Sequence, residues 1–327
     1  MNAFQCTRAA LRNTAAALLM LTPAAAWAQN EVYPNRTVTV IVPYASISSG
    51  TEPVIRMLLA ALSEKFGQQF IIETRGGANG AIGMNAVAKA KPDGYTLVFT
   101  NLSPTTVLPF VQKDVPYDTA KEFAPIFMIG RGESFILAGP SVKLPDLGQI
   151  LRFAKENPGK LTYAAVGAAQ RLNIAKLESA TGARFLVVPY KGTGEAGAAL
   201  LGGHVDIAVD TGDPARLSKG GALRVLASNN PVRTKHSPHI PVTAEWAPGF
   251  ESRAWHGILG PTGIPRDRIE LLHRELTAVV KQPRTRETML RLGLEPADAS
   301  IEDFAAVIRK ELQDHAQIVK QFNIIPN

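Results

Sequence analysis

Hydroxyl and amide side chains gather in two short segments that each follow a strand-like run of the sequence. The first segment follows the apolar run 37–44 and leads into an amphipathic, helix-like run at 52–66, and the second follows the apolar run 95–101. The polar residues at these two points are Tyr44, Ser46, Ser48, Ser49, Thr51, Asn101 and Ser103. A helix N-terminus exposes unpaired N–H groups and carries about half a positive charge. Hydroxyl donors beside one therefore predict a site for a small anion such as a carboxylate.

A second group of candidate residues follows strand-like runs in the middle of the chain. These residues are Gly167, Gln170 and Arg171 after the run 161–166, Tyr190 at the end of the run 184–190, and Asp210 at the end of the run 204–210. Ligands of open α/β sheets bind beyond the carboxyl ends of the strands. We therefore expect this group to face the same anion from the opposite side.

Two of these residues have a second interpretation. Arg171 is the one cation at a helix start in these segments, and a guanidinium can bind a carboxylate through two parallel hydrogen bonds. A solvated arginine is the equal alternative, although a cation at a helix N-terminus is slightly unfavourable. Asp210 either contacts the ligand or caps the helix-like run 213–220.

These segments need a framework that brings them together. From residue 37 to 101 the chain alternates strand-like and helix-like runs in the order βαβαβ, which is typical of a parallel sheet covered by helices on both faces. A second alternation predicts a second sheet of similar size, with strand-like runs at 135–140, 161–166, 184–190, 204–210 and 222–228. The Ser-x-x-Asp spacing of Ser300 and Asp303 predicts a capping box at the start of the last helix. Extended runs at 125–140 and 249–261 connect the two alternations and predict a hinge. The fold class is therefore α/β with two lobes.

The predicted organisation has three parts. Residues 1–28 form a signal peptide, residues 29–130 and 252–327 form a discontinuous first lobe, and residues 131–251 form the second lobe.

The predicted signal peptide rests on a short charged and apolar pattern. Arg8 and Arg12 precede an apolar run that ends in small residues at 26–28, so cleavage is expected before Gln29. The run is shorter than the roughly 20 apolar residues of a membrane span. The only cysteine, Cys6, lies in this leader. The mature chain is thus expected to lack a thiol for a disulfide, a thiolate-bound metal or a nucleophile.

Charge and motifs argue against several other function classes. The formal net charge is +7, but lysines and arginines are scattered without a run, which argues against nucleic acid as a partner. His236 and His239 stand in a proline-broken loop without a third ligand nearby, so no metal is expected. The glycines of 76–83 do not follow the G-x-G-x-x-G spacing, so no dinucleotide cofactor is expected.

Seven segments in order along the chain resemble the Bug family, the periplasmic solute-binding receptors of tripartite tricarboxylate transporters. They include GGANGAIG at 76–83, VPYKGTGEAGAALLGGHVDIAVD at 188–210 and WHGILGPTGIP at 255–265, and the match runs from about Tyr33 to the C-terminus. The resemblance implies a type II periplasmic-binding-protein fold, with two α/β lobes that close around a small carboxylate or related solute. It implies no catalytic residue, metal or cofactor.

Two segments depart from the family pattern. The loop at 45–50 lacks the usual paired glycines, and Glu52 stands where the family often has aspartate. Gln170 and Arg171 occupy positions that commonly carry hydroxyl residues. Missing glycines limit how closely the backbone can approach a ligand, so we expect side-chain hydroxyls to replace some backbone contacts. A relative's substrate therefore cannot be carried over.

The resemblance implies a monomeric periplasmic receptor that captures a small organic anion and delivers it to the membrane subunits of a tripartite tricarboxylate transporter. Two alternatives stay open at this point. The receptor can present its solute to a membrane sensor instead of a transporter. Alternatively, the chain is an exported enzyme that uses Asp210 or Glu52 as a general base in the same cleft.

Overall fold

The computed structural model describes residues 32–44, 51–234, 237–250, 252 and 254–321. Residues 36–327 form one compact unit. The predicted signal peptide and three of the candidate serines, Ser46, Ser48 and Ser49, lie outside the described residues. Across the described part of the chain, every helix is too short or too polar to traverse a lipid bilayer.

Six strands form the first sheet, in the order β11-β4-β10-β3-β1-β2. They are β1 (Val38–Val42), β2 (Phe70–Thr74), β3 (Thr96–Asn101), β4 (Phe123–Gly132), β10 (Ala254–Pro261) and β11 (Leu294–Pro296). β1 pairs in parallel with both β2 and β3, as the βαβαβ pattern predicts. β10 pairs antiparallel with β3 and β4, and β11 pairs antiparallel with β4. The extended run at 249–261 is therefore part of the sheet itself, which the sequence pattern did not indicate.

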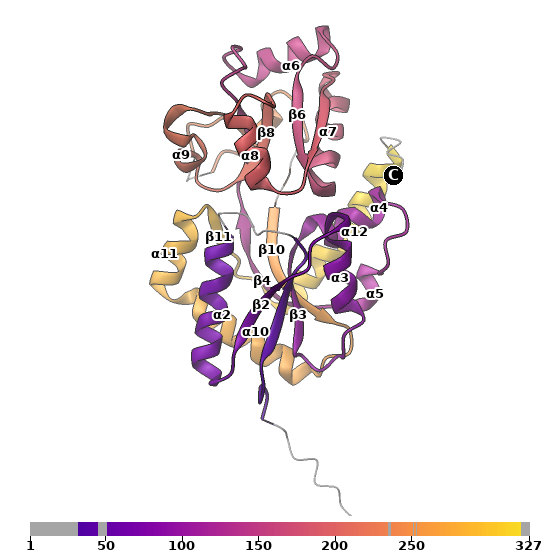
Figure 1. Cartoon of the computed structure of the whole chain (residues 1–327), viewed down its shortest axis with the longest axis vertical. Helices are drawn as coiled ribbons and strands as arrows, with labels where there is room; N and C mark the ends of the chain where they lie inside the picture. The colour runs from indigo at the N-terminus through magenta and orange to yellow at the C-terminus, as the bar shows by residue number, and fades with distance from the viewer. Residues whose placement is uncertain (1–31, 45–50, 235–236, 251, 253, 322–327) are drawn as a thin grey trace, which may run out of the picture. The chain divides into compact units, whose positions relative to one another are not determined.

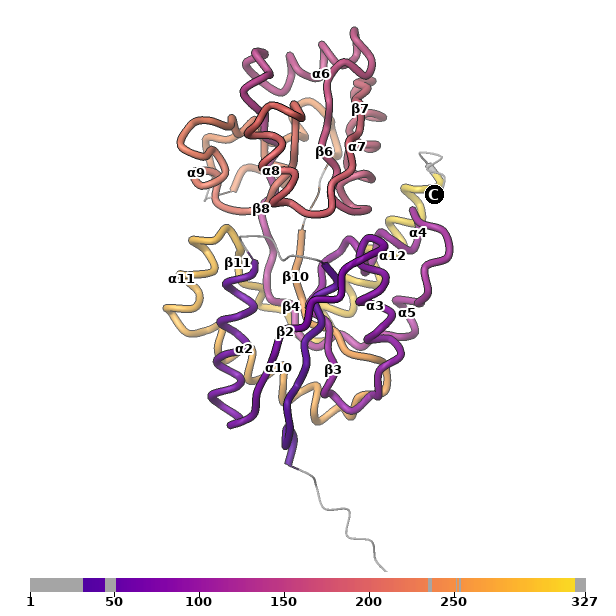
Figure 2. Tube along the Cα trace, viewed as in Figure 1, coloured from indigo at the N-terminus to yellow at the C-terminus, as the bar shows by residue number. Residues whose placement is uncertain are grey.

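Helices cover both faces of this sheet (Figure 1). α2 (Glu52–Phe66) and α10 (Arg266–Lys281) pack together on one face, with β2 and β4 beneath them. α3 (Ala81–Ala88) and α12 (Ile301–Gln321) cover the other face. The shorter helices beside the sheet are η1 (Ala78–Gly80), the π-helix η2 (Ser103–Val107), α4 (Leu108–Val111), α5 (Thr119–Glu122) and α11 (Pro283–Arg291). Figure 2 shows α12 beside α4, and the two helices are in contact.

The predicted start and end of α2 are confirmed by its bounds. Thr51 precedes the first helical residue, but its side chain makes no capping hydrogen bond. Gly67 ends the helix with φ of 64°, a left-handed conformation that glycine adopts without strain. Five side chains of α2 are buried against the sheet, namely Val54, Ile55, Leu58, Leu59 and Leu62. The i, i+3, i+4 spacing of these apolar residues explains which face of the helix is covered.

Five strands form the second sheet, in the order β7-β6-β8-β5-β9. They are β5 (Ser134–Ala138), β6 (Thr162–Val166), β7 (Leu186–Tyr190), β8 (Ile207–Thr211) and β9 (Arg224–Ser228). α6 (Leu147–Glu156) and α7 (Gly167–Thr181) pack on one face. α8 (Thr193–Leu201) and α9 (Pro214–Leu217) pack on the other, and the short helices η3 (Lys219–Gly221) and η4 (Thr243–Glu245) follow later in the chain. All five strands were predicted from the sequence.

The chain passes from the first sheet to the second at Glu133, between β4 and β5. The carboxylate of Glu133 accepts hydrogen bonds from the hydroxyls of Ser228 at 2.8 Å, Ser237 at 2.7 Å and Thr234 at 3.0 Å. β10 carries the chain back into the first sheet. The distribution of strands between the sheets fits two lobes, and the exact lobe limits stay a prediction.

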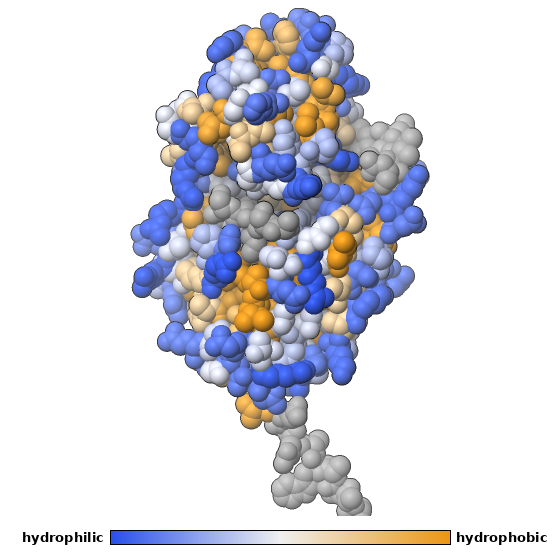
Figure 3. Space-filling model, in the orientation of Figure 1, coloured by the Kyte–Doolittle hydropathy of each residue, from blue (hydrophilic) through white to orange (hydrophobic). Residues whose placement is uncertain are grey.

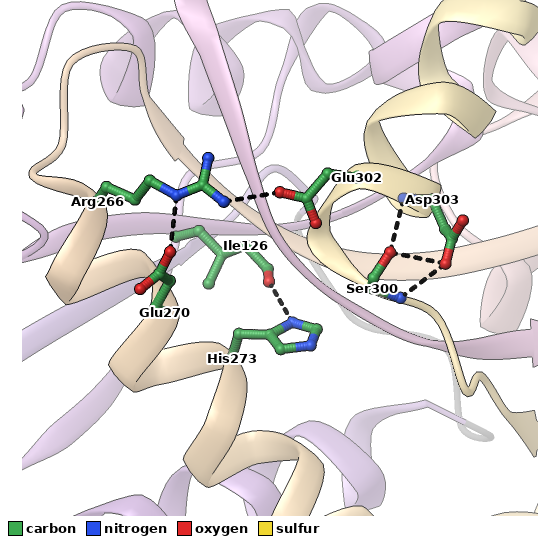
Figure 4. A network of polar contacts seen from close by, with 7 residues as sticks. All are labelled: Ile126, Arg266, Glu270, His273, Ser300, Glu302 and Asp303. Atoms are coloured by element: carbon green, nitrogen blue, oxygen red, sulfur yellow. Dashed lines mark hydrogen bonds and ion pairs between the residues drawn. The ribbon is translucent and has the colours of Figure 1, made fainter.

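The C-terminal helices are joined to each other by polar contacts (Figure 4). Arg266 of α10 donates hydrogen bonds to Glu270 at 2.7 Å and to Glu302 of α12 at 2.8 Å. Ser300 and Asp303 form a reciprocal cap at the start of α12, with the Asp303 N–H donating to the serine hydroxyl at 3.0 Å and the Ser300 N–H to the aspartate at 3.1 Å. This capping box was predicted from the Ser-x-x-Asp spacing.

The face seen in Figure 3 is mostly hydrophilic, with scattered hydrophobic areas. The large hydrophobic side chains that are exposed in the compact unit 36–327 include Ile71, Ile82, Leu186, Val187, Leu201 and Val232. Single exposed apolar residues of this kind are normal on protein surfaces.

Candidate functional site

Three of the predicted residues form a hydrogen-bonded cluster at the carboxyl ends of β1 and β3. The Tyr44 hydroxyl donates to Asn101 Oδ1 at 3.0 Å, and the backbone N–H of Ser103 donates to the same oxygen at 2.9 Å. The Ser103 hydroxyl also hydrogen-bonds Tyr44. The two polar segments that were predicted to form one side of the site are thus joined by hydrogen bonds between Tyr44, Asn101 and Ser103.

The amide of Asn101 has a fixed orientation. A backbone N–H can only donate, so the atom that faces the Ser103 N–H must be the amide oxygen. The Asn101 NH₂ group therefore points away from these two donors. No acceptor for it is found among the residues that the structure describes. The cluster leaves two N–H donors available at the strand ends.

Ser103 also contacts the start of α7, the helix that packs on the second sheet. The Ala169 N–H donates to Ser103 Oγ at 3.3 Å. Gly167, the first residue of α7, has φ of +71°, and a Cβ atom there would lie 3.1 Å from Ser103 Oγ. Glycine is suited to this position because the conformation is left-handed and the serine is close. The predicted residues Ser103 and Gly167 therefore lie side by side.

Burial raises the pKa of the Tyr44 hydroxyl well above its usual range, although its hydrogen bonds with Asn101 and Ser103 partly oppose this. The hydroxyl stays protonated at all physiological pH values. It can therefore donate to Asn101 continuously and keep the asparagine in place.

Gln170 and Arg171 differ sharply in their surroundings. Gln170 Oε1 accepts from the Val166 N–H at 2.9 Å, and Gln170 Nε2 donates to the Val209 carbonyl at 3.2 Å, so this side chain ties β6 to β8. Arg171 is exposed and makes no hydrogen bond or ion pair within the described ranges. Its guanidinium is free to meet an anion near the start of α7.

Tyr190 is the last residue of β7 and Asp210 lies near the end of β8, and these two strands flank β6 in the second sheet. Asp210 Oδ1 accepts from the Thr211 N–H at 2.8 Å, and burial raises the pKa of this carboxyl to about 6. The alternative interpretation of Asp210 as a helix cap is wrong, because Asp213 caps α9 by accepting from the Arg216 N–H at 3.1 Å. Tyr190 is half-buried and packs against the apolar cluster beneath α8.

Thr51 is buried at 4 % exposure, directly before α2. Glu52, which the enzyme alternative needs as a base, instead forms an exposed ion pair with Arg56 at 2.8 Å, four residues along the helix.

The residues that support η2, the segment that begins with Ser103, were not predicted from the sequence. Trp255 Nε1 donates to both carboxylate oxygens of Glu311 at 2.9 Å, and the Thr106 hydroxyl of η2 donates to Glu311 Oε2 at 2.9 Å. The His315 ring nitrogen Nδ1 lies 2.9 Å from the Thr106 carbonyl oxygen. α12 thus supports η2, the segment that begins with Ser103. A buried glutamate on a long helix gave no such signal in the sequence.

His256 was also missed. It lies on β10 directly opposite Asn101 on β3. Its side chain is 7 % exposed, and its Nδ1 atom has no hydrogen-bond partner among the described residues. Burial lowers the pKa of this imidazole to about 4, so it is uncharged at neutral pH.

A cavity of about 320 Å³ lies elsewhere, lined by residues from 131–133, 212–214, 230–234 and 290–295. None of the nine predicted site residues that the structure describes lines it. Within the residues that the structure describes, no three histidine, cysteine, aspartate or glutamate side chains are grouped so as to hold a metal ion.

The chain is similar to known proteins over most of its length. Residues 54–324 match the family model described as tripartite tricarboxylate transporter family receptor. Protein BugT of Bordetella pertussis is 31% identical over 297 residues, which cover 89% of this chain and 90% of BugT. A protein of Pseudomonas sp. strain P51 is 30% identical over 318 residues, covering 95% of this chain and 94% of the relative.

Solved structures share the fold over nearly the whole chain. An R. palustris protein with adipate superposes with a TM-score of 0.83 at 28% identity, covering 90% of this chain and 100% of that one. MatC from Rhodopseudomonas palustris with bound malate gives a TM-score of 0.81 at 26% identity, covering 88% and 100%. The periplasmic binding protein BugD gives 0.82 at 28% identity, covering 90% and 100%.

These matches confirm the two-lobed type II periplasmic-binding-protein fold and the Bug resemblance. The family is one of binding receptors and not of enzymes. The chain therefore belongs to the tripartite tricarboxylate transporter receptor family, which includes the Bug proteins.

Proposed function

We propose that this protein binds a small organic carboxylate between the strand ends of the first sheet and the start of α7. The ligand-binding residues are the twelve that the sequence suggested, with Asn101, Ser103, Gly167 and Arg171 closest to the centre. The observation that carries the proposal is the hydrogen bond from the Ala169 N–H to Ser103 Oγ. It brings the N-terminus of a 15-residue helix beside Ser103, whose N–H is bonded to Asn101, and the NH₂ group of Asn101 has no acceptor among the described residues.

The local charges favour an anion. The start of α7 supplies N–H groups and partial positive charge, Asn101 supplies two donors, and Arg171 supplies a full charge. A carboxylate accepts several hydrogen bonds at once, so it suits a site made mainly of donors. The adipate and malate in the two R. palustris structures are ligands of the same chemical class.

The proposal extends to the whole receptor. The lobes comprise residues 29–130 with 252–327 and residues 131–251, and they close about the connections at Glu133 and β10. A monomer acts in the periplasm after cleavage before Gln29 and delivers its ligand to the membrane subunits of a tripartite tricarboxylate transporter. Binding shifts the population from open to closed forms, because only the closed form contacts the ligand from both lobes.

A thermal-shift screen tests the proposal. The panel contains adipate, malate, citrate, glutamate and benzoate, with hexane-1,6-diol as a neutral control for adipate. We expect at least one acid to raise the melting temperature in a concentration-dependent way, because a ligand that binds only the folded state stabilises it. Recovery of the bound acid unchanged distinguishes a receptor from an enzyme. Silence of the folded protein to every acid would contradict the proposal, and N-terminal sequencing of the exported protein checks the cleavage site.

A further inference from the structure

His256 lies beside the proposed site, and no described residue forms a hydrogen bond with its side chain. In the antiparallel pairing of β10 with β3, His256 stands opposite Asn101. Residues opposite each other in such a pair have Cβ atoms roughly 4.5–5.5 Å apart and side chains on the same face. The imidazole is therefore a direct neighbour of the Asn101 amide.

The ring is held by an aromatic contact. It stacks on Phe99, with ring centroids 5.8 Å apart and an angle of 12° between the ring planes. Phe99 and Asn101 are two residues apart on β3, so both side chains point to the same face of the sheet. Stacking on Phe99 thus independently places His256 on the face that carries Asn101 and its partner Tyr44.

The polar atoms of His256 form no hydrogen bond with any residue that the structure describes. Nδ1 is buried and has no partner, and no hydrogen bond of this side chain is found in the described part of the chain. Buried polar atoms of native proteins are nearly always paired, and an exception calls for an explanation. A structural histidine normally has a hydrogen-bond partner, as the half-buried His273 does with the Ile126 carbonyl oxygen at 2.9 Å. His256 lacks this feature.

We propose that His256 is a ligand-contacting residue that, together with the Asn101 NH₂ group, binds one carboxylate of the solute and selects for it. This inference rests on the proposed function, which it deepens by adding a contact from β10. Two N–H donors on adjacent strands match the two oxygens of one carboxylate. The uncharged imidazole donates a hydrogen bond without adding positive charge. Arg171 therefore remains the one cationic side chain among the proposed ligand-binding residues.

The test uses two substitutions at His256 and one matched control. His256→Phe keeps an aromatic ring on Phe99 but removes both nitrogen atoms, whereas His256→Gln keeps an N–H donor. His273→Phe removes the other histidine that contacts a phenylalanine, Phe127, on this sheet. Affinities of all proteins for adipate, malate, citrate, glutamate and benzoate are measured by isothermal titration calorimetry, and urea unfolding verifies the fold.

We expect His256→Phe to weaken binding of the best acid about tenfold or more, the effect of losing a charge-assisted hydrogen bond. His256→Gln should recover most of that loss, and His273→Phe should bind like the wild type. Equal binding by His256→Phe and the wild type would overturn this inference while leaving the proposed function standing. A wild type that binds no acid of the panel would overturn both.

A second measurement on the wild-type protein covers the case in which His256→Phe does not fold. Imidazole nitrogen chemical shifts are followed by NMR while the best acid is added, with His256→Gln used to assign the His256 signals. We expect these signals to move in proportion to saturation and those of His273 to stay. Unchanged His256 signals at saturating acid would overturn the inference.

Discussion

The backbone N–H of Ala169 donates to the hydroxyl oxygen of Ser103 at 3.3 Å, which joins the start of α7 to the end of β3. These residues are 66 positions apart. Ser103 follows β3 of the first sheet, whereas Ala169 lies in α7, which packs on the second sheet. Ala168 and Leu172 of α7 are buried in the same apolar cluster as Val107 of η2. The contact is therefore polar at the helix start and apolar along its first turns.

Removing the Ser103 hydroxyl should weaken ligand binding. Ser103→Ala leaves the Ala169 N–H without its acceptor and removes the hydroxyl that contacts Tyr44. We expect about a fivefold to tenfold loss of affinity for the best acid, from about 1 kcal/mol of lost hydrogen bonding. Ser218→Ala, which removes an exposed hydroxyl bonded to the Ala215 carbonyl, is the control. Equal affinity of both variants for the acid would show that the Ser103 hydroxyl does not contribute to ligand binding.

Arg171 should pair with a charge on the ligand. Arg171→Ala is expected to weaken binding of a doubly charged acid by about tenfold or more, because a charge-assisted hydrogen bond is lost. The effect should shrink for benzoate, which has one charge, and at high salt. Arg152→Ala on the exposed side of α6 is the control for net charge. Isothermal titration calorimetry at two salt concentrations measures the effect, and unchanged affinity would return Arg171 to the solvated surface.

Much of this architecture could be predicted, because the spacing of apolar residues and the presence of capping residues indicate strands and helices. All five strands of the second sheet and the parallel core of the first were predicted, as was the cap at Ser300. The antiparallel places of β10 and β11 were not predicted, because a short extended run carries no information about its neighbours. The same limitation hid His256 and Glu311. His256 is a single polar residue in an apolar segment, and its side chain has no hydrogen-bond partner among the described residues. Glu311 is one of several charged residues on α12, and its partner Trp255 lies 56 positions away. The sequence did correctly bring together Tyr44, Asn101 and Ser103, because parallel strands end at one edge of a sheet.

Two buried groups should give opposite contributions to stability between about pH 4 and 6.5. The pKa of Asp210 is raised to about 6, so the folded state keeps a proton that the unfolded state has lost, and stability falls as pH rises from about 4 to 6. The pKa of His256 is lowered to about 4, so the unfolded state takes up a proton that the folded state refuses. Stability therefore falls as pH drops from about 6.5 to 4. The two effects largely cancel in the wild type.

Single substitutions should reveal each contribution. Asp210→Asn removes the aspartate effect, so the free energy of unfolding should rise with pH relative to the wild type, by roughly 2–3 kcal/mol across the window. His256→Gln removes the histidine effect, so the free energy of unfolding should fall with pH relative to the wild type by a similar amount. Urea unfolding at intervals between pH 4 and 7 measures both. Curves parallel to that of the wild type would show that neither pKa is shifted.

Loss of the Glu311 carboxylate should destabilise the support of η2. Trp255 is fully buried, so Glu311→Ala leaves its indole N–H without an acceptor, whereas the Thr106 hydroxyl keeps the Leu102 carbonyl as an acceptor at 3.1 Å. An orphaned buried donor costs about 1–3 kcal/mol. We expect the free energy of unfolding to drop by roughly 1–3 kcal/mol and ligand affinity to fall with it, whereas Glu311→Gln should lose less.

The control for Glu311 is Asp314→Ala, one turn further along α12. Asp314 pairs with Lys310 at the helix surface, an interaction of about 0.5 kcal/mol or less. Urea unfolding of the three variants compares them directly. A Glu311→Ala variant as stable as Asp314→Ala would show that α12 does not support η2.

Isothermal titration calorimetry of the wild-type protein with the acid that gives the largest thermal shift tests the central claim most directly. Asn101→Asp is titrated in parallel, because it replaces the free NH₂ group with a negative charge while keeping the side-chain shape. We predict saturable binding of one acid per chain by the wild type and no measurable binding by Asn101→Asp, since an anion cannot replace a donor toward a carboxylate. Undiminished binding by Asn101→Asp would contradict the account, as would a wild type that binds none of the acids.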